Sequence, residues 1–337
     1  MIMDKVLIVA ELSANHNGSK KVAFDTVRAA RRAGADAIKL QTYTADTLTL
    51  DCDRPDFVLG DGLWKGYTLY GLYQQAYTPW EWHEEIFHVA REEGLECFST
   101  PFDRTAVDFL ESLGTPVYKI ASFEITDIPL IDYIASKGKP IILSTGVATV
   151  EDIELALDTI RKRGVTDITL LKCTSEYPAP IERANLLTIP DMKSRFSVKA
   201  GLSDHTLGSD VAVAATALGA TMIEKHFIID RSIGGPDVAF SMQADEFAAM
   251  VRSVRNVQKA LGGVYYPEDV ASIPGRGSCR SLYVAEDVKA GDKADGRNVR
   301  SVRPGFGLHP KYYFDIIGKT FVRDMNKGDR LSLDDIV

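Results

Sequence analysis

The chain has 337 residues, of which 39 are Lys or Arg and 47 are Asp or Glu, so its formal charge is −8. Hydrophobic residues make up 45% and charged residues 26%, which excludes a disordered chain, because disorder requires low hydrophobicity and a high net charge. The acidic balance argues against binding to duplex nucleic acid, although a few local lysines could still bind an anionic substrate.

Neither a membrane span nor a secretion signal is predicted. No stretch approaches the roughly 20 apolar residues that a spanning helix needs. The apolar run near the N-terminus is too short for a signal peptide and already contains Asp4. Four cysteines are present without C-x-x-C spacing, and a chain of this length does not need disulfides. We therefore expect a cytoplasmic protein with reduced thiols.

Eight short apolar runs alternate with longer stretches of helical periodicity. Each run is apolar throughout, which is typical of a parallel strand buried on both faces. The runs are 6–9, 37–40, 95–98, 117–120, 140–143, 168–171, 198–202 and 222–227. The predicted helices are 19–33, 79–94, 105–113, 129–137, 150–163, 209–218 and 245–261, whereas 182–196 is the least regular stretch. Thr78 and Glu81 predict a capping box at the start of the second helix.

This alternation predicts a (β/α)8 TIM barrel over residues 1–263, since one such barrel takes about 250 residues. A doubly wound open sheet is the alternative, but the chain has neither G-x-G-x-x-G after the first strand nor G-x-x-x-x-G-K-[ST]. Residues 264–280 are rich in Gly, Pro and polar residues and are predicted to be a linker. Residues 281–337 predict a small second domain that buries little core and docks on another surface.

Polar residues follow the predicted strands at the ends where barrel enzymes carry their catalytic groups. Lys39 and Lys119 fall at two of these ends, together with the hydroxyl residues Thr100, Ser122, Ser144 and Ser203. A lysine supplies a point charge and a hydroxyl a neutral donor, so this set suits a phosphate together with a carboxylate. For any single lysine, an outward position paired with an acid is the alternative. Several donors at the same relative place favour a site.

Two histidines, His205 and His226, end neighbouring predicted strands. Neutral imidazoles there could hold a divalent metal with open positions for water or substrate, and two core histidines are the alternative. Glu11, Glu124 and Asp237 are acid–base candidates if they are buried near the lysines. Glu11 could instead simply pair with a barrel lysine.

The ordered motifs at these strand ends resemble the sialic acid synthase family along nearly the whole chain. They are AELSANHNG (10–18), ADAIKLQT (35–42), FSTPF (98–102), YKIAS (118–122), ILSTG (142–146), GLSDHT (201–206), EKHF (224–227) and GPD (235–237). The C-terminal segment, with SVRPG at 301–305, resembles the antifreeze-like (SAF) domain of that family.

The resemblance implies a reaction. Phosphoenolpyruvate would condense through C3 with the open-chain aldehyde of an N-acetylated amino sugar, water would add at C2, and phosphate would leave by C–O cleavage. The product would be a nine-carbon 2-keto sugar acid. A divalent metal, Mn²⁺ or Mg²⁺, would be held by His205 and His226 and would polarise the aldehyde oxygen.

The resemblance also implies roles by position. Glu11 and Glu124 would exchange protons with the water and the sugar hydroxyls. The resemblance does not indicate which of the two is the base. The phosphoenolpyruvate ligands would be Lys39, Thr100, Lys119, Ser122, Ser144 and Ser203. Gln41, Tyr177 and Asp237 would face the sugar and Phe102 would line the pocket. Ser175 is a further substrate-binding candidate, standing where some members carry Asn. In this family the small domain reaches across a homodimer, so Arg303 would contact the sugar's N-acyl group in the partner's barrel.

The long second loop departs from the members that form N-acetylneuraminate. It carries GLWKG (62–66), TLY (68–70) and AYTPWEWH (76–83) and resembles the branch that forms pseudaminic acid. The sugar of that branch is 2,4-diacetamido-2,4,6-trideoxy-L-altrose, whose methyl and acetamide groups could pack on Tyr and Trp. Ordinary loop packing is the alternative for these aromatics.

Other activities stay open at this point. The sugar could be that of an N-acetylneuraminate or a legionaminic acid synthase. A different class is a Schiff-base lyase that uses Lys172, which stands at the end of the sixth predicted strand where many members carry His. A third is a non-catalytic carbohydrate-binding protein built on the SAF domain.

Overall fold

The structure is a computed structural model and describes residues 5–337. It divides into two compact units, one ending at Gly263 and the other running from Val264 to Val337. The two units are described separately below.

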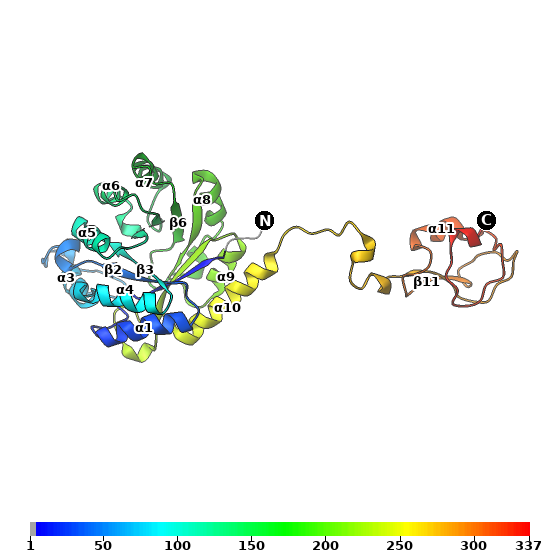
Figure 1. Ribbon diagram of the computed structural model, residues 1–337, viewed down its shortest axis with the longest axis horizontal. Coiled ribbons are helices and arrows are strands. Elements are labelled where there is room, and N and C mark those ends of the chain that lie inside the picture. The colour runs from blue at the N-terminus through cyan, green and yellow to red at the C-terminus, as the bar shows by residue number, and fades with distance from the viewer. Residues whose placement is uncertain (1–4) are drawn as a thin grey trace. The chain divides into compact units, whose positions relative to one another are not determined.

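Eight parallel strands close into a barrel in the first unit (Figure 1). They pair in sequence order, and the first strand also pairs with the eighth, which confirms the predicted (β/α)8 barrel. The strands are β1 (Leu7–Glu11), β2 (Ala37–Thr42), β3 (Glu96–Pro101), β4 (Tyr118–Ile120), β5 (Ile141–Ser144), β6 (Ile168–Cys173), β7 (Lys199–Asp204) and β8 (Met222–Ile228). A two-residue strand, β9 (Met242–Gln243), pairs with the end of β8.

Helices connect the strands and surround the barrel (Figure 1). They are α1 (Lys20–Arg32), α4 (His83–Glu92), α5 (Arg104–Ser112), α6 (Ile128–Ala135), α7 (Val150–Lys162), α8 (Thr188–Phe196), α9 (Asp210–Ala217) and α10 (Ala244–Leu261). The long connection after β2 contains two more helices, α2 (Ala45–Leu48) and α3 (Leu69–Ala76). Among the described residues, no helix is long and apolar enough to cross a bilayer. All four cysteines are free.

Two sequence expectations differ from the structure. The predicted capping box at Thr78 is wrong, because the Thr78 hydroxyl lies 3.1 Å from the ring of His16 and α4 begins only at His83. Helix α8 forms within residues 182–196, a stretch for which the sequence predicts no helix. Its Pro190 falls in the first helical turn, where no intrahelical N–H bond is lost.

The inside of the barrel contains two layers of side chains. The first, here called the apolar layer, consists of Val9, Ala37, Phe98, Ile142, Leu171 and Met222. Side chains on a strand return to the same face every second residue, so the inward residues two positions further on form the next layer. This polar layer consists of Glu11, Lys39, Thr100, Lys119, Ser144, Cys173, Ser203 and Glu224, and all of them are buried.

The second unit contains two antiparallel strands, β10 (Ser281–Val284) and β11 (Val299–Val302), and one short helix, α11 (Tyr313–Ile316). It has a buried apolar cluster of its own, formed by Leu282, Val284, Val288, Ala294, Val299, Ile316, Phe321, Met325, Leu331 and Ile336. Many short backbone bonds between turns add to the pairing of its two strands.

Candidate active site

One lysine lies between two carboxylates in the polar layer. The Nζ of Lys39 is 2.5 Å from Oε2 of Glu11 and 3.8 Å from Oε1 of Glu224, and all three side chains are buried. The strand register explains this contact, because Glu11 is level with Lys39 on β2 and with His226 on β8. The alternative that Glu11 pairs with a barrel lysine is confirmed, since its partner is Lys39. Both side chains point into the barrel, where the other groups of the site lie.

The charges of this cluster depend on one another. Burial raises the pKa of Glu11, Lys39 opposes the shift, and the negative charge of Glu224 adds to it. Burial also disfavours the charged form of Glu224, but Lys119 and Lys39 outweigh it and lower the pKa of Glu224. Burial likewise opposes the charge of Lys39, but both carboxylates together raise its pKa. Glu11 is therefore the carboxyl that takes up a proton more readily.

A second lysine faces a group of hydroxyls. The Nζ of Lys119 donates to Oγ of Ser144 at 2.7 Å and to the Ile120 carbonyl at 3.0 Å, and its burial lowers its pKa. The amide of Gly146 donates to Oγ of Ser122 at 3.1 Å. A Cβ at residue 146 would lie only 2.2 Å from Oγ of Ser175 and 2.9 Å from Oγ of Ser122.

These groups form a cradle suited to an anion. A buried ammonium group without a carboxylate within ion-pair distance among residues 5–337 contacts the hydroxyl of Ser144, and two further hydroxyls, of Ser122 and Ser175, lie beside Gly146, two residues along the chain from Ser144. An anion entering this cradle would receive charge-assisted hydrogen bonds and compensate the lysine. The absent side chain of Gly146 leaves the room that the hydroxyls need.

The other two predicted hydroxyls serve the carboxylate cluster. Oγ1 of Thr100 lies 3.4 Å from Nζ of Lys39, and Oγ of Ser203 donates to Oε1 of Glu224 at 3.1 Å. Sequence reasoning did not assign Glu224 to the site. The signal was available, because Glu224 and His226 are two residues apart on one strand and must share a face.

The two predicted metal-binding histidines lie side by side. The ring centroids of His205 and His226 are 5.4 Å apart. Nδ1 of His205 is 2.9 Å from the Thr174 carbonyl, and Nδ1 of His226 is 3.6 Å from Oδ2 of Asp237. An oxygen facing Nδ1 orients an imidazole so that Nε2 is available to a metal.

The donor set thus fits a metal with two protein ligands and open positions. Nδ1 of His226 and Oε1 of Glu11 are buried atoms without a hydrogen-bond partner. Such atoms are expected where a bound ligand, metal or water would supply the partner. Among residues 5–337, no three His, Cys, Asp or Glu side chains converge as a complete metal-binding group. Any further ligands would have to be water or substrate.

Asp237 joins the loop after β8 to the loop after β1. Its Oδ2 accepts a hydrogen bond from the amide of Ala14 at 3.3 Å. Burial opposes its charge, but contacts with His226, Ser13 and Ala14 outweigh burial and lower its pKa. The Tyr177 ring packs on His205 with 4.4 Å between centroids, so this predicted sugar-facing residue also lies beside the histidines.

The remaining predicted barrel residues lie at the same end of the strands. Glu124 ends a short 3-10 turn after β4, and burial raises its pKa to about 7 although Lys119 opposes the shift. Gln41 is level with Thr100 in the β2–β3 register. Phe102 packs edge-on against Tyr43, with 5.2 Å between ring centroids.

Two further residues named by the sequence are Lys172 and Arg303. Lys172 is offset by one residue from Leu171 and Cys173, so it points away from the barrel interior. It lines an outer cavity beside α7 and α8, and its Nζ donates to the Cys173 carbonyl at 2.6 Å. Arg303 follows β11 in the second unit and is exposed.

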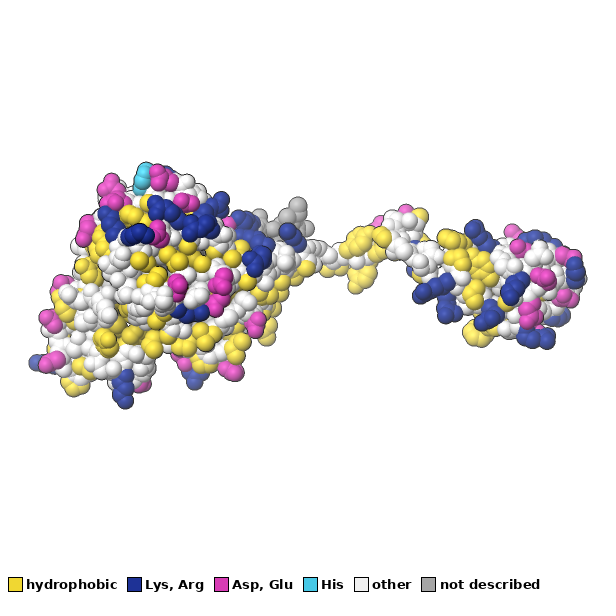
Figure 2. Space-filling view, turned by 90° about the horizontal axis from the view of Figure 1, so that it is seen from below, with side chains coloured by type: hydrophobic (Ala, Val, Ile, Leu, Met, Phe, Trp, Pro, Cys, Tyr) yellow, Lys and Arg dark blue, Asp and Glu magenta, His cyan; other side chains and the backbone are white. Residues whose placement is uncertain are grey.

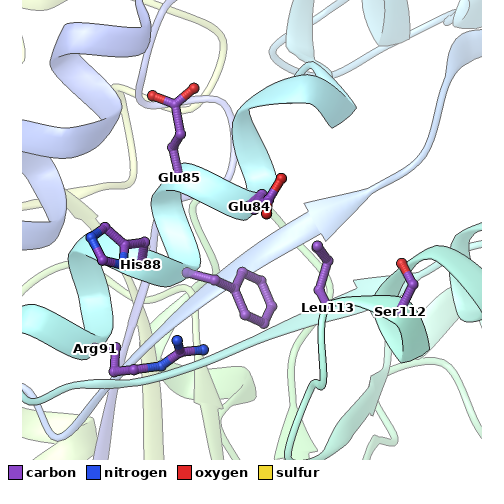
Figure 3. Close-up of a pocket in the computed structure, with 7 residues that line it drawn as sticks. Glu84, Glu85, His88, Arg91, Ser112 and Leu113 are labelled. Carbon is purple, nitrogen blue, oxygen red and sulfur yellow. The ribbon is translucent and has the colours of Figure 1, made fainter.

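A surface groove on the outside of the barrel is not part of this site. It runs between α4 and α5 and is lined by Glu84, Glu85, Phe87, His88, Arg91, Ser112 and Leu113 (Figure 3). Nε2 of His88 is paired with Glu92 at 3.2 Å within α4. On the face of the barrel drawn in Figure 2, both acidic and basic side chains are exposed.

Fold and site together define a (β/α)8-barrel protein with an anion cradle, buried carboxyls and a histidine pair at the carboxyl ends of its strands. Residues 26–266 match the NeuB family, and residues 280–337 match the SAF domain. The chain belongs to the NeuB family.

Known proteins resemble this chain over almost its whole length. It is 47% identical to a pseudaminic acid synthase of Campylobacter jejuni, covering 98% of this chain and 96% of that protein. It is 46% identical to a pseudaminic acid synthase of Helicobacter pylori, covering 98% and 97% respectively. The crystal structure of an N-acetylneuraminic acid synthetase from Leptospira borgpetersenii, in complex with citrate, superposes with a TM-score of 0.71 at 29% identity, covering 80% of this chain and 89% of that one.

Proposed function

We propose that this protein is a pseudaminic acid synthase. It condenses phosphoenolpyruvate with 2,4-diacetamido-2,4,6-trideoxy-L-altrose and water, giving a nine-carbon 2-keto sugar acid and inorganic phosphate. The observation that carries the proposal is the convergence of the anion cradle, the buried carboxyls and the histidine pair at one end of the barrel. The 47% identity to a pseudaminic acid synthase supports the choice of sugar.

Phosphoenolpyruvate binds with its anionic groups at the two buried lysines. Lys119, with Ser122 and Ser144, holds one anionic group in the cradle, and the Gly146 amide orients the Ser122 hydroxyl by donating to it. Lys39, with Thr100, holds the other. Lys119 is buried without a carboxylate at ion-pair distance, so its charge attracts an anion more strongly than an exposed lysine does, whereas the charge of Lys39 is also balanced by Glu11 and Glu224.

His205 and His226 would hold a divalent metal, Mn²⁺ or Mg²⁺. When bound, the metal supplies Lewis-acid polarisation of the sugar's aldehyde oxygen. The Thr174 carbonyl keeps the His205 ring in the orientation that presents Nε2, whereas the Asp237 carboxylate faces Nδ1 of His226 at 3.6 Å without a hydrogen bond. Gln41, Tyr177 and Asp237 position the sugar, and Phe102 closes the side of the pocket.

The buried carboxyls move the protons. C3 of phosphoenolpyruvate bonds to the aldehyde carbon, water adds to C2, and the C2–O bond to phosphate breaks. Burial raises the pKa of Glu11 and raises the pKa of Glu124 to about 7, so both carboxyls are candidates for holding and releasing a proton. The hydroxyls of Ser175 and Ser122 both lie next to Gly146. We therefore assign Ser175, like Ser122, to the binding of the phosphate.

One assay tests the reaction and its sugar. Phosphate release is measured with phosphoenolpyruvate and a panel of sugars: the diacetamido altrose, the corresponding diacetamido mannose, and N-acetylmannosamine. We expect turnover with the altrose, dependence on added metal after chelation, and transfer of a bridging ¹⁸O label to phosphate. Activity only with N-acetylmannosamine would overturn the pseudaminic assignment, and label retained in the sugar acid would overturn C–O cleavage.

A homodimer is part of the proposal. Arg303 of one protomer binds the N-acyl oxygen of the sugar held in its partner's barrel, because a guanidinium group donates readily to a carbonyl. Arg303→Ala should raise the KM for the sugar about tenfold, since one charge-assisted hydrogen bond is lost, with the KM for phosphoenolpyruvate unchanged. Lys311→Ala, a charge removed in the same unit, is the matched control. Equal losses for both substrates would refute the assigned contact.

A further inference from the structure

Of the three tryptophans in the chain, Trp64 is the one whose ring contacts residues of the site. Trp80 stacks on Phe109 with 4.9 Å between centroids, and Trp82 packs edge-on against His16 at 5.5 Å. Trp64 instead packs against Tyr177 and Phe240, with centroid distances of 5.9 and 6.3 Å.

The loop after β2 is folded so that Trp64 stands at its tip. Leu59 and Tyr67 form the base, where the Leu59 amide donates to the Tyr67 carbonyl at 2.9 Å. Gly62 and Gly66 flank the tip with φ values of +74° and +88°, a region where glycine is unstrained. Trp64 is half-buried, although its neighbours on both sides are exposed. The tip therefore inserts one side chain and leaves the rest in water.

That side chain reaches the loop after β8, a strand that is separated from β2 only by β1. Nε1 of Trp64 donates to the carbonyl of Pro236 at 3.2 Å, next to Asp237. Tyr177 and Phe240, which receive the indole ring, pack in turn on the histidine pair, Tyr177 on His205 at 4.4 Å and Phe240 on His226 at 4.9 Å. Trp64, Tyr177 and Phe240 thus form an aromatic wall. Tyr177 and Phe240 contact the histidines, and Trp64 packs on these two rings, farther from the place proposed for the sugar aldehyde.

We infer that Trp64 is a specificity-determining residue that selects a sugar whose end remote from the aldehyde is apolar, as in a 6-deoxy sugar. This inference rests on the proposed function. Indole has a single hydrogen-bond donor, and Pro236 already accepts from it, so only the apolar face of the ring is left for a ligand. A methyl group packs on that face, whereas a hydroxyl there loses water without gaining a partner.

Kinetics with two substrates test the inference. The ratio of kcat/KM is measured for the 2,4-diacetamido-2,4,6-trideoxy sugar against its 6-hydroxy counterpart, in the wild type, Trp64→Ala and Trp64→Phe. A wholly apolar contact discriminates against an added hydroxyl by up to about a hundredfold, so we expect Trp64→Ala to lower the ratio at least about tenfold. Trp64→Phe should retain most of it, and the KM for phosphoenolpyruvate should not change. An unchanged ratio, or equal loss for both sugars and phosphoenolpyruvate, would overturn the inference.

A binding measurement removes the dependence on turnover. Sugar added without phosphoenolpyruvate should change the tryptophan fluorescence of the wild type and of Trp82→Phe, which keeps Trp64. The same sugar should leave the fluorescence of Trp64→Phe unaltered. A change that persists in Trp64→Phe would refute contact with the sugar. If the wild type turns over only a different sugar, the proposed function fails, and fluorescence with that sugar still decides whether Trp64 touches it.

Discussion

The apolar and polar layers of the barrel interior lie two residues apart on the same strands. The apolar layer stabilises the fold, whereas the polar layer carries the charged groups of the site. Val9 is followed on the inner face by Glu11, Ala37 by Lys39, and Met222 by Glu224. The apolar layer is stabilised by burial itself. The polar layer is buried equally deeply but leaves Glu11 and Glu224 with atoms lacking hydrogen-bond partners, as does His226 two residues beyond Glu224. Burial therefore stabilises the apolar layer by packing, whereas in the polar layer it leaves polar atoms that a bound ligand could pair with.

The largest expected effect is at the histidine pair. Replacing both His205 and His226 by alanine should lower kcat at least about a thousandfold, because removal of a Lewis acid costs several kcal/mol of transition-state stabilisation. Metal content measured on the purified protein should fall in parallel, and thermal unfolding serves as the control for folding. Intact turnover in the double variant would end the metal assignment.

A pair of variants sets the two layers against each other. Phe98→Ala should destabilise the protein by about 3–5 kcal/mol, because it opens a cavity in the apolar layer. Lys119→Met should leave stability unchanged or higher, since a buried charge is replaced by a side chain of similar volume. It should instead raise the KM for phosphoenolpyruvate about tenfold or more, since a charge-assisted contact is lost. Urea unfolding and initial rates measure both, and a large loss of stability in Lys119→Met would contradict the comparison.

Glu124 predicts a pH dependence. Burial raises its pKa to about 7 from a usual value of 4.5, so the folded protein holds this proton more tightly than the unfolded chain does. The stability that this group contributes is present below about pH 4.5 and is lost as the pH rises to about 7. The melting temperature should fall over that window more in the wild type than in Glu124→Gln.

The same ionisation should appear in the kinetics. The profile of kcat/KM against pH should bend near 7 in the wild type and lose this bend in Glu124→Gln. Asp158→Asn, an exposed carboxyl removed from α7, is the control, because Asp158 is not among the groups that shift the pKa of Glu124. A bend that survives in Glu124→Gln assigns the titration to another group.

The smallest effect is expected at Lys172. Because its side chain points away from both layers, Lys172→Met should keep kcat and both KM values within about twofold of the wild type. Borohydride in the presence of pyruvate should leave no covalent adduct on this residue. An adduct, or an inactive variant, would restore the Schiff-base alternative.

The sequence predicts the barrel well because strand and helix periodicities are local properties. It also predicts the strand ends at which Lys39, Lys119, His205 and His226 gather, because parallel strands in a barrel end at one rim. Alternation along a strand groups residues by face, but only the structure shows which group faces the barrel interior. The sequence therefore places Glu224 at a strand end without a role and allows Lys172 as a nucleophile.

Long-range loop contacts are beyond such reasoning. Trp64 and Pro236 are separated by 172 positions, and their hydrogen bond depends on how two loops fold over the barrel mouth. Thr78 shows the same limit at short range, because its local pattern fits a cap while a tertiary contact with His16 takes its hydroxyl. Local preference decides where elements form, and tertiary contacts decide what their side chains do.

Gly146 makes the anion cradle sensitive to a single carbon atom. The nearest obstacles to a Cβ there, at 2.2 and 2.9 Å, are the rotatable hydroxyls of Ser175 and Ser122 rather than backbone. An alanine could be accommodated by turning those hydroxyls away, so the fold would tolerate it. The turned hydroxyls would no longer face the anion. Gly146→Ala would thus keep the stability of the fold and weaken anion binding. A selection for stability alone would not detect this substitution.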